Sequence, residues 1–207
     1  MKYSKSKKYI AMHLAILMGL VISISMYSFC SGCENIKENV LRLHIIANSD
    51  SDFDQDLKLK VRDELLICSE ELFGGETNKL TAEKIASQEK AYLIERAKQI
   101  INENGKNYDV KIAVCEDYFP TRTYENVTLP AGNYTAVKVI IGEGKGHNWW
   151  CVMFPPMCLP AATGDTEIED VLDENGMKVV SSSPKYEIKF KVVEWYEWAK
   201  NKILNRK

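Results

Sequence analysis

The fold is decided by the stretch LRLHIIANSDSDFDQDLKLKVRDELLICSEEL, residues 41–72. At its start, apolar Leu41, Leu43 and Ile45 alternate with polar Arg42 and His44, which is the period of a half-buried β-strand. Residues 48–54 are acidic and contain two serines, so they supply candidate N-caps for a helix. Apolar residues then recur at the spacing of an amphipathic helix, namely Leu57, Val61, Leu65, Cys68 and Leu72. This stretch therefore predicts a strand followed by a helix.

Similar patterns predict the remaining elements. Helices are expected over 81–104 and 194–204, and strands over 108–114, 134–141, 149–154 and 186–192. The glycine-rich run 142–146 separates two of these strands, so we expect them to pair antiparallel around a flexible turn. Strands and helices that segregate along the chain favour the α+β class. We predict a single α+β domain over residues 34–207, with a mostly antiparallel sheet, two helices in its N-terminal half and a C-terminal helix.

Residues 1–33 form an N-terminal signal or anchor helix of a different character. Four lysines within residues 2–8 precede the apolar run Tyr9–Cys30, whose 22 residues span roughly 33 Å as a helix, close to the thickness of a bilayer. Because basic residues resist translocation, residues 34–207 are expected to be extracytoplasmic. The segment is either a signal peptide that is removed or a membrane anchor that remains. The tetrad Cys30-Ser31-Gly32-Cys33 also resembles a lipobox, with Cys33 as the lipid attachment site.

Charge and motifs exclude several classes of function. The whole chain has a net charge of −2, but residues 34–207 carry 23 basic and 29 acidic residues, or −6, which argues against nucleic-acid binding. His-Glu-x-x-His, Gly-x-Ser-x-Gly and Asp-Thr-Gly do not occur, so we predict no catalytic residue, cofactor or metal. A serine–lysine pair stays open, because its members meet only in three dimensions. A zinc or manganese site is the minor alternative, drawn from His44, Asp50, Asp52 and His147.

Cysteines and tryptophans near residue 150 carry two further predictions. Six residues, including two prolines, separate Cys151 from Cys158, and extracytoplasmic cysteines are oxidised, so this pair is the candidate disulfide. Closing so short a loop stabilises a domain by roughly 2–3 kcal/mol. On a strand, one of Trp149 and Trp150 points inward and the other is available for contact with a partner or a carbohydrate.

Five ordered blocks of sequence carry a family resemblance. They are LRLHIIANSDSD continuing through QDLKLKVR (41–62), Phe119-Pro-x-Arg122-x-Tyr124, Leu129-Pro-Ala-Gly-x-Tyr134, Ile141-Gly-x-Gly-x-Gly146, and Asn148-Trp-Trp-Cys-Val152-x-Phe154-Pro-Pro-x-Cys158. Together they resemble the stage II sporulation protein R family, over about residues 38–195. Such long ordered blocks are far more specific than any short motif.

The resemblance implies a signalling protein of endospore-forming bacteria that is not an enzyme. Such a protein is exported from the forespore into the space between the forespore and mother-cell membranes. There it activates a membrane-embedded aspartic protease of the mother cell, which then cleaves the precursor of sigma-E. Packing in a core does not fully explain some of the polar and aromatic residues in these blocks. We nominate them as partner-binding residues: Asn48, Asp50, Asp52, Arg122, Asn148 and Trp149.

Two other functions are kept as alternatives. An extracytoplasmic hydrolase would use a carboxylate or a serine–lysine pair, with His44 assisting. A cell-wall or carbohydrate-binding protein would need Trp149 or Trp150 as a flat exposed ring beside polar groups.

Overall fold

A computed structural model describes residues 2–76, 78–124, 127–155, 168–181 and 187–204. Its elements in chain order are α1 (Lys2–Asn39), β1 (Leu41–Ile46), α2 (Asp52–Phe73), α3 (Lys79–Gln88), α4 (Lys90–Glu103), β2 (Val110–Phe119), β3 (Arg122–Tyr124), β4 (Val127–Leu129), β5 (Gly132–Ile141), β6 (Asn148–Phe154), α5 (Ile168–Val171), α6 (Glu174–Val180) and α7 (Glu187–Leu204). The α+β class, the N-terminal apolar helix, the mostly antiparallel sheet and the C-terminal helix are confirmed.

Strand β1 lies inside the main sheet, whose order is β2-β5-β1-β6. It pairs parallel with β5 and antiparallel with β6, while β2 pairs antiparallel with β5. The prediction that residues 134–141 and 149–154 pair with each other is therefore wrong, because β1 is inserted between them. Residues Leu41 to Ile45 are buried on both faces of the sheet, as a central strand requires.

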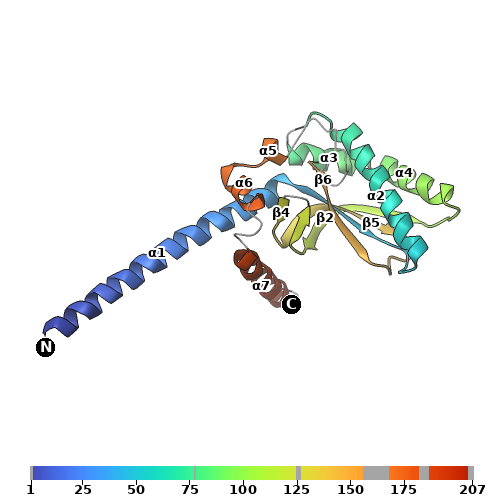
Figure 1. Cartoon of the computed structure of the whole chain (residues 1–207). Helices are drawn as coiled ribbons and strands as arrows, with labels where there is room; N and C mark the ends of the chain where they lie inside the picture. The colour runs from blue at the N-terminus through green and yellow to red at the C-terminus, as the bar shows by residue number, and fades with distance from the viewer. Residues whose placement is uncertain (1, 77, 125–126, 156–167, 182–186, 205–207) are drawn as a thin grey trace.

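Helices α2, α3 and α4 cover one face of this sheet (Figure 1). Alternate residues of the strands, such as Leu43 and Val139, project onto this face and pack with Leu65 of α2 and Leu93 of α4. All four side chains are fully buried. Ser51 caps α2, since its hydroxyl accepts a hydrogen bond from the Asp54 N–H at 3.2 Å, as the acidic, serine-containing segment predicted.

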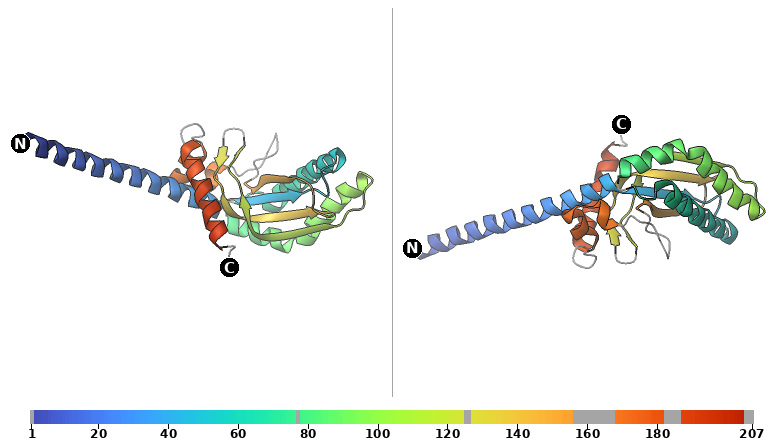
Figure 2. Two further views of the ribbon diagram at one scale, coloured as in Figure 1. Left: turned by 90° about the horizontal axis from the view of Figure 1, so that it is seen from below. Right: turned by 90° about the horizontal axis from the view of Figure 1, so that it is seen from above.

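The opposite face is covered at one end only. There α1, α6 and the small β3–β4 hairpin enclose a second apolar cluster that includes Phe119 and Tyr134 (Figure 2, left). Arg42 is fully buried in this cluster, where its guanidinium lies 4.2 Å from the centre of the Phe119 ring. It donates to the Cys151 carbonyl and the Tyr124 hydroxyl, each at 2.8 Å. Burial lowers the pKa of Arg42, although Tyr124 and Tyr134 partly oppose this effect.

Two further expectations about the helices change. The predicted helix over 81–104 is two helices, α3 and α4, which meet at Glu89. The strand predicted over 186–192 is wrong, because α7 already begins at Glu187. Phe190, Val193 and Glu197 recur at helical spacing and are all buried, whereas Val192, which shares the two-residue alternation with Phe190, is exposed. Burial by tertiary contact thus follows the helical period here.

Helix α1 is long and apolar enough to cross a membrane, by its length and composition. It continues past residue 33 without a break and enters the domain, so the predicted boundary falls inside a helix. Phe29, Cys33 and Ile36 are buried in the second apolar cluster, whereas the large apolar residues from Tyr9 to Tyr27 are exposed, except for the half-buried Met26. The same helix therefore serves as an apolar rod at one end and as part of the core at the other.

Candidate functional site

The loop after β1 and the glycine-rich turn after β5 are locked together. The side-chain oxygen of Asn48 accepts a hydrogen bond from the Glu143 N–H at 3.0 Å, and the Gly146 N–H donates to the Ala47 carbonyl at 2.9 Å. A Cβ on Gly142 or Gly146 would overlap Asn48 or the carbonyl of Ser49, and Gly142 also has φ +57°. The glycines thus let the turn after β5 approach the loop after β1 closely. The turn is therefore packed in place, whereas a flexible turn was expected.

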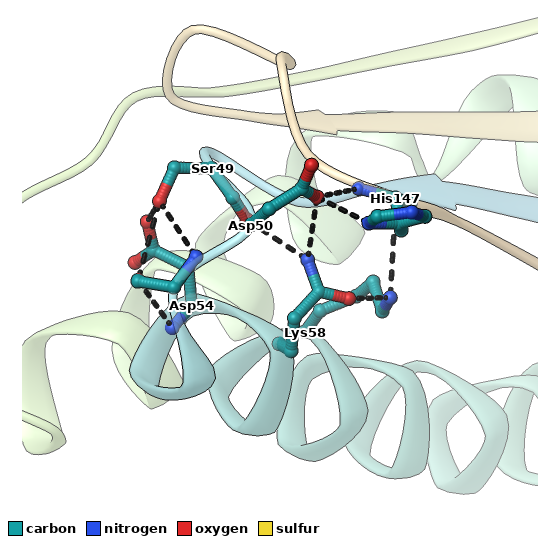
Figure 3. A network of polar contacts seen from close by, with 7 residues as sticks. Ser49, Asp50, Asp54, Lys58 and His147 are labelled. Carbon is teal, nitrogen blue, oxygen red and sulfur yellow. Dashed lines mark hydrogen bonds and ion pairs between the residues drawn. The ribbon is translucent and has the colours of Figure 1, made fainter.

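Asp50 and His147 form the exposed rim of this junction (Figure 3). One Asp50 oxygen accepts from the His147 backbone N–H at 2.6 Å and lies 2.5 Å from the His147 Nδ1. Beneath them, the Lys58 ammonium is almost fully buried and donates to the His147 carbonyl at 3.1 Å and to Gln55 Oε1 at 2.6 Å. Burial lowers the pKa of Lys58, although the negative charge of Asp50 partly opposes this.

Asp54 holds the other side of the loop. Its carboxylate is buried and accepts hydrogen bonds from Asn48 Nδ2 at 2.8 Å and from the Ser49 hydroxyl at 2.5 Å. Burial by itself raises the pKa of this carboxyl, but the hydrogen bonds from Ser49 and Asn48 outweigh that effect and lower it. Asp54 and the half-buried Asn48 therefore keep the loop in one conformation, which leaves Asp50 and Asp52 exposed at its surface.

A second polar cluster lies on the part of the sheet that no described helix covers. His44 of β1 contacts Asp117 of β2 through Nδ1 at 2.6 Å and Asn148 of β6 through Nε2 at 3.0 Å. Its ring stacks on Trp150 with 5.8 Å between centroids, and Lys138 approaches Asp117 at 3.0 Å. Both partner atoms of His44 are oxygens that accept, so both contacts are hydrogen bonds when each ring nitrogen carries a proton.

Asp117 is the residue of this cluster that the sequence did not indicate. It lies 73 positions from His44, and only the pairing of β2 and β1 on either side of β5 brings the two together. Burial raises the pKa of Asp117, but the hydrogen bonds from His44 and Lys138 outweigh this and lower it below the ordinary carboxyl value. Asp117 is thus an ionised acceptor at neutral pH.

The six nominated partner-binding residues do not form one cluster. Asn48, Asp50 and Asp52 lie on the loop after β1, and Asn148 lies on the uncovered sheet face beside His44. Two arginines stack on the tryptophans: Arg122 lies 4.7 Å from the centre of the Trp150 ring, and Arg62 lies at the same distance from that of Trp149. Both tryptophan side chains are partly buried, so neither is the flat exposed ring that the carbohydrate-binding alternative requires.

The metal and disulfide expectations fall partly within the described residues. Among these residues there is no group of three or more His, Cys, Asp or Glu side chains that could hold a metal ion. Asp50 meets His147, but His44 contacts Asp117 instead, so the four residues of the metal alternative do not converge. Cys151 is buried and disulfide-bonded, while Cys158 lies outside the described residues, so the pairing of these two cysteines stays a prediction.

These features define a class of protein: a small α+β domain carried on an apolar N-terminal helix, with a rigid polar rim and no metal cluster in the part of the chain described. A family model described as "Stage II sporulation protein R" matches residues 37–164. The chain is also 30% identical over 171 residues to stage II sporulation protein R of Bacillus subtilis (strain 168), covering 79% of this chain and 75% of the relative. The chain belongs to the stage II sporulation protein R family. No solved structure matches it.

Proposed function

We propose that the chain is an exported sporulation signal that activates a membrane-embedded aspartic protease of the mother cell, which then processes the precursor of sigma-E. Membership of the stage II sporulation protein R family is the observation that carries this proposal. The apolar helix α1 supports it, because it supplies a route out of the cytoplasm. The site lies in the space between the two membranes, where the exported domain meets the protease.

The proposed contact surface has two separate exposed parts, the loop after β1 and the sheet face beside His44 and Trp150. Asp50, Asp52, Arg122 and Asn148 are exposed and so are available to a partner. Asn48 and Trp149 are partly buried and have structural contacts of their own, so they position this surface from behind. A loop that is already fixed by Asp54 and the glycine turn loses little conformational entropy on binding.

Activation requires that the domain bind the active state of the protease more tightly than the inactive state. A tenfold shift of that equilibrium needs about 1.4 kcal/mol of differential affinity, which one or two charge-assisted hydrogen bonds can supply. An aspartic dyad can be completed by two half-sites, so we propose that the favoured state is an assembled protease dimer. The domain then acts by contact and performs no chemistry.

The test uses the purified full chain, the protease in vesicles and the precursor. We expect processing to depend on this chain, and Asp52→Ala and Arg122→Ala to reduce it about tenfold each, in line with the loss of one contact. Glu95→Ala is the matched control, since Glu95 is an exposed acid on α4, away from the proposed surface. Processing at the full rate without this chain would refute the role.

The hydrolase alternative is favoured by one observation, the contact between His44 and Asp117, because a carboxylate commonly orients a histidine base. However, the other ring nitrogen faces the amide oxygen of Asn148 at 3.0 Å, where a nucleophilic hydroxyl or thiol would be needed. Turnover of a murein fragment or a peptide by the receptor-free protein, lost in His44→Asn, would establish this alternative in place of signalling.

A further inference from the structure

Helix α7 buries one face against the domain and leaves the large side chains of its other face exposed. Phe190, Val193 and Glu197 form the face that is buried against α1 and the sheet. On the opposite side of the helix the large side chains are mostly exposed: Trp195 by 70%, Tyr196 by 60% and Trp198 by 55%, together with Val192. These rings leave roughly 300–400 Å² of mainly apolar surface uncovered, which is comparable to the largest patch on a typical monomer.

The contacts of α7 place this aromatic face where α1 leaves the domain. Phe190 packs edge-to-face on Phe29 of α1 with 5.4 Å between ring centroids, and Glu197 pairs with Lys37 of α1 at 3.0 Å. Phe29 is the point at which α1 changes character, since Tyr27 just before it is 78% exposed and Phe29 is buried. In both views of Figure 2, α7 lies at the α1 end of the domain, and the left view shows it crossing the direction of α1.

We propose that α7 lies in the headgroup region of the bilayer that α1 spans, with Trp195, Tyr196 and Trp198 in contact with lipid. If α1 crosses a bilayer along its exposed apolar stretch, the membrane surface comes at the level of Tyr27 to Phe29, which is the level of the first turn of α7. Helix α7 crosses α1 at this level in its first turn and inclines away from the surface toward Glu197, whose partner Lys37 lies eight residues, or about 12 Å, farther along α1. Tryptophan and tyrosine are the side chains most enriched at the membrane surface, because their rings are amphipathic.

The charges of α7 fit a lipid surface better than they fit a second protein. Lys191, Lys200 and Lys202 are distributed along the helix. Lys191 pairs with Glu194 at 2.8 Å, Lys200 lies 3.9 Å from Glu197, and Lys202 lies 4.6 Å from the centre of the Trp198 ring. Lysines beside interfacial aromatic residues reach anionic headgroups with their long side chains. This inference does not depend on protease activation.

Tryptophan quenching in vesicles tests the proposal. The full chain is reconstituted in phosphatidylcholine–phosphatidylglycerol vesicles, with and without lipids brominated near the top of the acyl chain. Two of the four tryptophans are on α7, so the brominated lipid should quench roughly half of the emission. The double variant Trp195→Phe, Trp198→Phe should lose this quenching, whereas the matched control Trp149→Phe should retain it.

Both α7 tryptophans are exposed, so the double variant should melt at the wild-type temperature, which shows that the fold is intact. Equal quenching of the wild type and the double variant, or no quenching of either, would overturn the proposal. Concentration-dependent cross-linking through α7 that the double variant abolishes, without quenching, would also overturn it, because the face would then bind a second copy.

Discussion

Replacement of Gly146 by alanine tests the idea that the glycine-rich turn exists for close packing. Gly146 does not need a left-handed backbone, because its φ lies outside the positive range. In an open position the substitution would therefore be neutral or slightly stabilising. Here the added Cβ would collide with the carbonyl of Ser49 and lie 2.8 Å from the Cβ of Ala47. The obstacle is mainly backbone, which cannot move aside as the end of a flexible side chain can.

The expected cost follows from two contributions. Overpacking at a well-packed site costs about 1–3 kcal/mol. Separation of the two segments also weakens the hydrogen bond from the Gly146 N–H to the Ala47 carbonyl, which contributes about 1 kcal/mol. The total is about 2–4 kcal/mol, and for a domain of this size that corresponds to a fall in Tm of roughly 5–15 °C.

The assay is thermal unfolding of the full chain in detergent micelles, followed by near-ultraviolet circular dichroism. Gly105→Ala is the matched control, because Gly105 has φ +76° but open space around its Cβ position. Its cost should be limited to the left-handed conformation, about 1 kcal/mol. If Gly146→Ala melted at the wild-type temperature, or above Gly105→Ala, the glycine run would not be explained by close approach.

Three further predictions concern the core, the uncovered face and the cysteines. Arg42→Ala should cost about 3–5 kcal/mol in urea unfolding, whereas Arg42→Met, which keeps volume and removes a buried charge, should cost much less. Asp117→Asn should be destabilising at pH 7. The wild-type advantage should shrink as pH falls below about 4, because a carboxyl whose pKa is lowered by folding stabilises fully above its unfolded-state pKa and loses this effect as the pH falls through its folded-state pKa. Alkylation and mass spectrometry should find Cys151 and Cys158 protected until reduction, and reduction should cost roughly 2–3 kcal/mol.

The elements that the sequence predicted are those set by local signals. The Ser51 cap and the apolar spacing of α2 lie within one continuous stretch, so the helix could be placed without knowledge of the rest of the chain. The alternation of Leu41, Leu43 and Ile45 likewise identified β1. Asp50 and Asp52 are exposed and lie at the start of α2, as the predicted position of the helix start implied.

What the sequence could not predict depends on pairings between distant segments. Arg42 and His44 are the polar residues in the alternating pattern of β1, and on a half-buried strand their side chains would face water. Both side chains are buried, because α1, the β3–β4 hairpin and Asp117 cover that side of the strand, and all three come from other parts of the chain. The parallel pairing of β1 with β5 has no local signal either, since the two strands are joined by three helices and the three strands β2, β3 and β4.

The C-terminal part of α1 is buried, which makes this helix part of the core of the domain that follows it. Removal of residues 1–33 would take away Phe29 and Cys33, expose Phe190, remove the close packing of Gly32 on α6, and leave only the last turns of α1 in the core. Losing two buried side chains of this size costs several kcal/mol, a large part of the stability of a typical domain. We therefore expect α1 to be retained as an anchor, with cleavage as the alternative that this cost in stability opposes. If α1 is retained, the domain cannot diffuse far from its own membrane, so the protease of the proposed function would meet it only where the two membranes lie close together.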